Sequence, residues 1–281
     1  MFHTFFHKVQ SYKGRIRMHR KNFILYSALR ILVILTAARC LYEGHYESFA
    51  LCILSLLLFL LPSFFEEKLQ VHIPPLFEAM IYLFIYAAEI LGEVNKYYTT
   101  IPGWDTMLHT INGFLCAAIG FSLVDIMNRH SKHMRLSPAY VAMAAFCFSM
   151  TVGVMWEFFE YEADNFFFLD MQKDTIVDTI GSITLDETHS QIPVRISDIA
   201  ETTITTSSGE TYVIQGGYLD IGIHDTMKDL LVNFIGAVVF SIIGFLYERN
   251  RIRKQKGGKV NTIAASLIVT PSSPDSLEND S

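Results

Sequence analysis

The stretch SFALCILSLLLFLLPSFF (48–65) decides the fold class, because it is an uncharged run close to the length that a helix needs to cross a bilayer. It belongs to a chain of 281 residues that is 51% hydrophobic and has a mean hydropathy of +0.31. An ordinary soluble domain of this length is less apolar. The sequence therefore predicts an all-α, polytopic membrane bundle.

Six apolar runs approach the roughly 20 residues that span about 30 Å of hydrocarbon. Each predicts a transmembrane helix: 23–42, 47–65, 75–94, 104–127, 139–161 and 225–247. The first is interpreted as a retained membrane helix, because its polar lead-in is long and no small-x-small cleavage site follows. The four cysteines stand singly and are interpreted as buried apolar side chains, with a Cys40–Cys52 disulfide left open.

Basic residues gather on one side of this arrangement. Residues 1–22 carry six Lys or Arg, 128–135 carry three, 248–259 carry six and Lys68 adds one, which together make 16 of the 22 in the chain. Short cytoplasmic loops accumulate Lys and Arg. We therefore predict a bacterial plasma-membrane protein with both termini in the cytoplasm. Its parts are a basic N-terminus, five helices, an external loop, a sixth helix and a tail: 1–22, 23–161, 162–224, 225–247 and 248–281.

The loop 162–224 is acidic, with 11 Asp or Glu against Lys173 and Arg195. Within it, TTITTSSGETYVI (202–214) alternates in strand fashion around a Ser-Gly turn, which predicts a small β-hairpin covering the helix ends. Residues 260–281 are rich in Ser and Pro apart from one short apolar patch. They are predicted to form a disordered cytoplasmic tail.

Polar side chains recur at helical spacing where the predicted spans meet the external side. Asp105 and His109 lie four residues apart, and Asp229 and Asn233 repeat that step, while the fifth span closes with acids three residues apart. Polar groups facing lipid cost several kcal/mol, so we expect them inside the bundle. The candidate catalytic residues are Asp105, His109, Glu157, Asp229 and Asn233, and the candidate metal ligands are Asp105, His109, Glu157, Glu160 and Asp229.

The chemistry of this set leaves alternatives open. Crowded carboxylates either share protons or hold a cation, and His with Asp or Glu suits a divalent metal such as Zn, Mn or Fe. A structural reading is also available, because Asp105 and Asp225 suit helix N-termini and a buried polar network can fix helix register. Four glycines are interpreted as sites of close helix contact: Gly113, Gly120, Gly236 and Gly244.

Three motifs carry a resemblance to known families: YYTTIPGWDTMLHTINGF (97–114), WEFFEY (156–161) and DTMKDLLVNFIGA (225–237). Together they resemble the YjdF-like family of bacterial inner-membrane proteins, which has no established activity. They are more distantly similar to VanZ-like proteins, which are linked to glycopeptide resistance and carry D-x-x-x-H, E-x-x-Q, an Arg and D-x-x-x-N-x-x-G. This chain has Glu160 in place of the Gln and no Arg clearly ahead of Asp229. The resemblance implies a multi-pass membrane protein with a polar site.

Three functions follow as hypotheses. The first is a membrane-embedded enzyme or binding protein that acts on an envelope lipid or a lipid-linked intermediate, with a divalent metal as the candidate cofactor. The second is a transporter of a cation, a proton or a small solute. The third is a membrane scaffold whose polar cluster is structural. The lipid bilayer is the expected partner in each, and no nucleic acid is expected.

Overall fold

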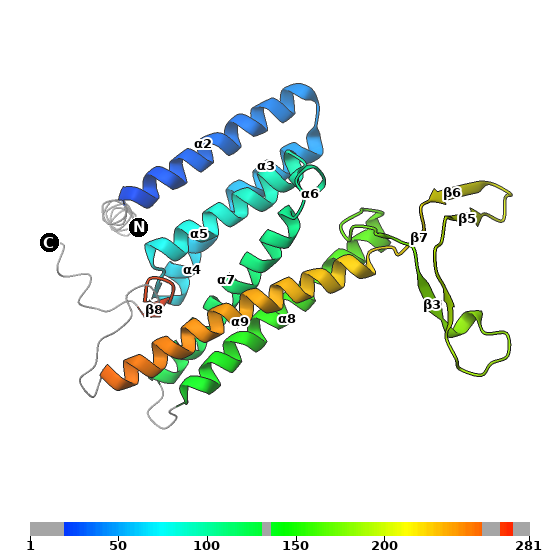
Figure 1. Ribbon diagram of the computed structural model, residues 1–281. Helices are drawn as coiled ribbons and strands as arrows, with labels where there is room; N and C mark the ends of the chain where they lie inside the picture. Colours follow the sequence, from blue (N-terminus) through cyan, green and yellow to red (C-terminus); the bar gives the residue numbers. More distant parts are fainter. Residues whose placement is uncertain (1–19, 131–135, 255–264, 272–281) are drawn as a thin grey trace. The chain divides into compact units, whose positions relative to one another are not determined.

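The computed structural model describes residues 20–130, 136–254 and 265–271 (Figure 1). Among these residues, six helices are long and apolar enough to cross a membrane: Asn22–Glu43, Tyr46–Leu69, Pro75–Val94, Trp104–Arg129, Pro138–Phe167 and Ile223–Arg253. They coincide with the six apolar runs, so the prediction of a helical membrane bundle with a small strand-containing insertion is confirmed. Most of the predicted basic N-terminus lies outside the described residues.

The first span is α2 (Arg20–Glu43), and the last three are α7 (Trp104–His130), α8 (Pro138–Phe167) and α9 (Ile223–Lys254). The second span is divided into α3 (Tyr46–Leu58) and α4 (Leu61–Leu69), since Pro62 cannot donate to the preceding turn and suits a helix start. The third continues from α5 (Pro75–Ile85) into a π-helical segment, η1 (Tyr86–Val94). The short α6 (Tyr97–Thr100) leads into α7.

The chain divides into two compact units, the first formed by Met1–Gly153 with Val232–Ser281 and the second by Val154–Leu231. The division falls inside α8 and α9, each of which is one uninterrupted helix. The first unit holds two apolar clusters. One joins α2, α3 and η1 around Val33, Cys52 and Ile90, and the other joins α5, α7 and α9 around Phe77, Phe121 and Phe240.

The second unit contains three antiparallel strand pairs. They are β2 (Ile176–Val177) with β7 (Tyr218–Leu219), β3 (Ile180–Ser182) with β4 (Val194–Ile196), and β5 (Glu201–Thr205) with β6 (Thr211–Gln215). The turn η2 (Ile183–Leu185) follows β3. The β5–β6 pair is the hairpin predicted at 202–214, closed by the bond from Thr206 N to Glu210 O at 2.9 Å. Its predicted position over the helix ends stays a prediction.

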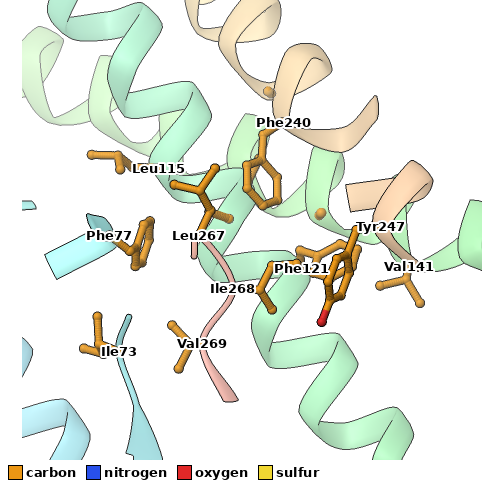
Figure 2. Close-up of a cluster of buried hydrophobic side chains, with 14 residues drawn as sticks. Ile73, Phe77, Leu115, Phe121, Val141, Phe240, Tyr247, Leu267, Ile268 and Val269 are labelled. Carbon is orange, nitrogen blue, oxygen red and sulfur yellow. The ribbon is translucent and has the colours of Figure 1, made fainter. Parts of the chain in front are cut away.

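The C-terminal tail contradicts the expectation of disorder over 265–271. Residues Thr270–Pro271 form β8, which pairs antiparallel with β1 (Val71–His72). Leu267, Ile268 and Val269 are 6%, 1% and 9% exposed, and they lie among aromatic and aliphatic side chains of α5, α7 and α9 (Figure 2). The apolar patch within the Ser- and Pro-rich tail is therefore a core segment. The rest of 260–281 lies outside the described residues.

The cysteines follow the prediction in three cases of four. Cys40, Cys52 and Cys116 are free and buried, whereas Cys147 is free and exposed. An exposed apolar thiol on a membrane helix faces surroundings that are themselves apolar, so burial in protein is not required there. The disulfide between Cys40 and Cys52 is not formed in this structure.

Candidate functional site

The first turns of α7 hold a carboxylate–imidazole pair. Asp105 Oδ1 lies 3.4 Å from His109 Nε2, and the two side chains are 24% and 11% exposed. The spacing of four residues puts both groups on one helix face, as the sequence predicted. The pair begins the fourth membrane span, so it stands where an apolar run starts rather than in a solvent loop.

Further along α7, the helix meets α9 backbone to backbone. A Cβ added at Gly113 would lie 2.1 Å from Asn233 O, and one at Gly236 would lie 2.0 Å from Thr110 O. Only glycine leaves room for this approach, which confirms the prediction of close helix contact at these positions. The approach encloses Asn233, which is 1% exposed.

Asn233 is held from both neighbouring helices of the first unit. Asn112 Nδ2 donates to its Oδ1 at 3.5 Å, and its own Nδ2 donates to Met150 Sδ at 3.6 Å. Ser149 Oγ donates to Gly113 O at 2.8 Å and so ties α8 to the same turn of α7. The sequence reasoning missed Ser149 and Met150, because neither residue type stands out in an apolar run.

Glu157 and Glu160 lie on α8 within the second unit and are 5% and 8% exposed. Trp156 Nε1 donates to Glu160 Oε1 at 2.8 Å. The indole N–H of Trp156 therefore helps to fix the orientation of one of the two carboxylates.

The start of α9 carries a lysine between two acids. Lys228 Nζ lies 2.8 Å from Asp225 Oδ1 and 3.8 Å from Asp229 Oδ1, and Asp229 is only 2% exposed. Asp225 also accepts a hydrogen bond from Lys173 N at 2.8 Å, which fastens the chain after α8. Asp225 is therefore a loop anchor. His224 is exposed.

The cap of α9 is Asp220 instead. Its carboxylate accepts from the backbone N–H groups of Thr175, Gly222 and His224 at 2.8 to 3.0 Å. Burial acts to raise the pKa of Asp220, but these donors outweigh it and hold the pKa below its ordinary value. The sequence reasoning assigned the capping position to Asp225 because Asp220 stands three residues before the helix begins.

Since α9 is uninterrupted, Asp229, Asn233 and Gly236 follow one another at steps of four and three residues on one face. Within the first unit, Asp105 and His109 supply a carboxylate and an imidazole that could serve as ligands of a metal ion. Such nitrogen and oxygen donors suit Zn, Mn or Fe, while no thiolate takes part.

A second ionic cluster, at the other end of α7, was not predicted. Arg251 Nη1 lies 2.9 and 3.0 Å from the two oxygens of Asp125, and its Nη2 lies 2.7 Å from Glu248 Oε1. Arg129 adds contacts to Asp125 at 2.6 and 2.8 Å. Asp125 is 1% exposed and Glu248 2%. In the sequence, acidic and basic residues stand close together near the ends of two predicted spans. This spacing was the signal that could have indicated the cluster.

Comparison with known families supports the membrane assignment. The family described as predicted membrane protein, DUF2238, matches residues 24–188. The chain belongs to this family. The matched range holds Asp105, His109, Glu157 and Glu160 and ends before α9. The protein is thus a membrane protein with several apolar helices embedded in a lipid bilayer.

One curated relative is an uncharacterized protein of Thermotoga maritima. It is 25% identical to this chain over 132 residues, which are 44% of this chain and 67% of that protein. No solved structure matches the chain. Neither the family nor the relative is described with a reaction. The function proposed below therefore rests on the chemistry of the candidate site.

Proposed function

We propose that this protein holds a divalent metal ion with Asp105, His109 and Asp229 and uses the site to bind or transform an envelope lipid or a lipid-linked intermediate. The observation that carries the proposal is the Asp105–His109 pair, with 3.4 Å between the nearest oxygen and nitrogen, at the start of a membrane-spanning helix. A carboxylate and an imidazole one turn apart form a common half of a metal site.

The remaining polar residues have supporting roles under this proposal. Under it, Asp229 is a third donor suggested by the sequence, Glu157 and Glu160 supply further acid or base groups, and Asn233 orients a partner through its amide. A bound metal would also supply positive charge for a phosphate-bearing lipid. The metal would supply Lewis acidity, while the carboxylates would move protons.

The envelope setting rests on the sequence. The distribution of Lys and Arg supports cytoplasmic termini and an external polar site in a bacterial plasma membrane. The motif resemblance to YjdF-like and, more distantly, VanZ-like proteins supports a multi-pass membrane protein with a polar site. Glu160 at the position of the Gln in the VanZ-like pattern leaves a different substrate available to this chain.

The test is the metal content of tag-free, full-length protein purified in detergent, measured by elemental analysis for Zn, Mn and Fe. We expect a stoichiometric metal in the wild type and its loss in His109→Ala. The matched control is His224→Ala, which removes an exposed histidine at the start of α9 and should keep the metal. Wild-type protein that neither retains a metal nor takes up added Zn or Mn contradicts the proposal.

A cation transporter is the second candidate. Its specific support is Asp125, a carboxylate that is 1% exposed within a membrane-spanning helix. Uptake of labelled Mn²⁺ or Zn²⁺ into proteoliposomes separates the two: uptake that Asp229→Asn abolishes supports transport, while a metal-loaded protein without uptake supports lipid chemistry.

The scaffold alternative predicts a different pattern. If the polar residues only fix packing, His109→Ala and Asp229→Asn should lower the amount of folded protein in the membrane. Variants that accumulate normally and lose metal oppose the scaffold.

A further inference from the structure

An apolar groove lies between α8 and α9 within the first unit, and it is called the α8/α9 groove below. Its volume is 490 Å³, inside the range of about 300–1,000 Å³ that small-molecule sites occupy. On α8 it is lined by Ala142, Met143 and Phe146, and on α9 its lining runs from Phe234 to Phe245. Met143 is 64% exposed, so the groove opens toward the surroundings of two membrane-spanning helices, which are lipid.

The dimensions of the α8/α9 groove favour a single hydrocarbon chain. From Phe234 to Phe245 the helix rises about 16 Å, which is about half of the roughly 30 Å of hydrocarbon in a bilayer. Over that length a volume of 490 Å³ corresponds to a width of about 6 Å, whereas a helix with its side chains is about 10–12 Å across. The groove is therefore as long as one leaflet is deep and too narrow to take a helix of another chain.

The two ends of the groove differ in chemistry. At one end the rings of Phe146 and Phe234 meet edge to face, with their centroids 5.3 Å apart. At the other end the guanidinium group of Arg249 lies over the Phe245 ring, 5.6 Å from its centroid, which is the range of a cation–π contact. Arg249 is exposed and stands just after the apolar run that ends at residue 247. An aromatic end and a cationic end suit an amphiphile with an anionic head group.

We propose that the α8/α9 groove binds one acyl chain of an anionic phospholipid whose phosphate contacts Arg249. The head group then lies where residues 248–259 carry six Lys or Arg, and basic residues at a membrane boundary attract anionic lipids. Along the acyl chain the contacts are apolar, with Ser241 as the one polar residue of the lining. This site involves neither Asp105 nor His109 and requires no metal.

Native mass spectrometry of delipidated, full-length protein in detergent tests this proposal. The two probes are dipalmitoyl phosphatidylglycerol and dipalmitoyl phosphatidylcholine. We expect one molecule of phosphatidylglycerol to bind about fivefold more tightly than phosphatidylcholine, which is the advantage that one basic side chain gives to an anionic head group. Equal affinities for the two lipids would overturn the proposal.

Two neighbouring valines of α9 provide a matched test of the groove itself. Val238 lines the groove, whereas Val239 is 46% exposed and lies outside the lining. Val238→Trp should fill the groove and abolish the tight binding of phosphatidylglycerol, while Val239→Trp should leave it unchanged. If both variants bind the lipid as the wild type does, the lipid lies elsewhere and the proposal is wrong.

A second pair of variants tests the head group and decides the question if Val238→Trp does not fold. Arg249→Gln changes an exposed side chain and should remove the preference for phosphatidylglycerol. Arg195→Gln, at an exposed position of β4 in the second unit, should retain it. A preference that survives in Arg249→Gln contradicts the proposed contact. Wild-type dimers that Val238→Trp converts into monomers would show that a second copy covers the groove, which would also overturn the lipid site.

Discussion

The two ends of α7 both carry acidic side chains, yet they differ in burial and in what those groups can do. At the Arg251 end, two carboxylates meet two guanidinium groups at 2.6 to 3.0 Å. Guanidinium stays charged at any physiological pH, so this end is electrostatically fixed. At the Asp105 end the partner of the carboxylate is the imidazole of His109, a side chain that commonly binds metals in proteins. The two ends therefore differ in the type of counter-charge as well as in burial.

The largest expected effect tests the fixed end. Arg251→Ala leaves Asp125 and Glu248 buried, with Arg129 as the remaining basic partner among the described residues, and breaking a buried ion pair costs about 3–5 kcal/mol. We expect a large loss of thermal stability in detergent, measured by the loss of folded protein on size-exclusion chromatography after heating. Arg253→Ala, at an exposed position of the same helix, should be close to wild type.

If Arg251→Ala were as stable as Arg253→Ala, the Arg251 cluster would not hold the helices together. The proposed difference between the Arg251 end and the Asp105 end of α7 would then be wrong. If the folded fraction of Arg251→Ala still binds metal, the Asp105 end acts independently of the Arg251 end, and the difference is strengthened.

A smaller effect on stability is expected for alanine substitutions at two glycines of α9, one of which contacts backbone and the other a side chain. A Cβ at Gly236 meets Thr110 O at 2.0 Å, while one at Gly244 meets the Phe121 ring at 2.7 Å. The carbonyl belongs to a helix and cannot move alone, whereas a ring can shift. We expect Gly236→Ala to cost about 1–3 kcal/mol, as overpacking does, and Gly244→Ala to cost clearly less, since alanine also favours the helix. Equal unfolding midpoints in denaturant would oppose this distinction.

Sequence patterns predicted the spans and the pairing of Asp105 with His109, because both follow from periodicity within one helix. The Arg251 cluster was missed because it joins positions 126 residues apart, Asp125 and Arg251, and no local pattern reports such a contact. The apolar patch of Leu267, Ile268 and Val269 was misread for a related reason. A three-residue apolar patch is too short to predict a structure, and only its contact with apolar side chains of other segments makes it a core element.

The smallest expected effect concerns pH and the clasp between β1 and β8. His72 Nδ1 lies 3.5 Å from Glu66 Oε1, and hydrogen bonding to Glu66 raises the pKa of His72 despite the opposing effect of burial. Because the folded-state pKa is above 6.5, the stabilisation is fully present below pH 6.5 and is lost as the pH rises through the folded-state value. The side chain is 40% exposed, so the effect should stay below about 1 kcal/mol. Hydrogen exchange of residues 266–270, relative to the unfolded chain at each pH, should be modestly faster near pH 8.5 than near pH 6, and His72→Gln should abolish the difference. A pH dependence that survives in His72→Gln would assign the titration to another group and separate the clasp from His72.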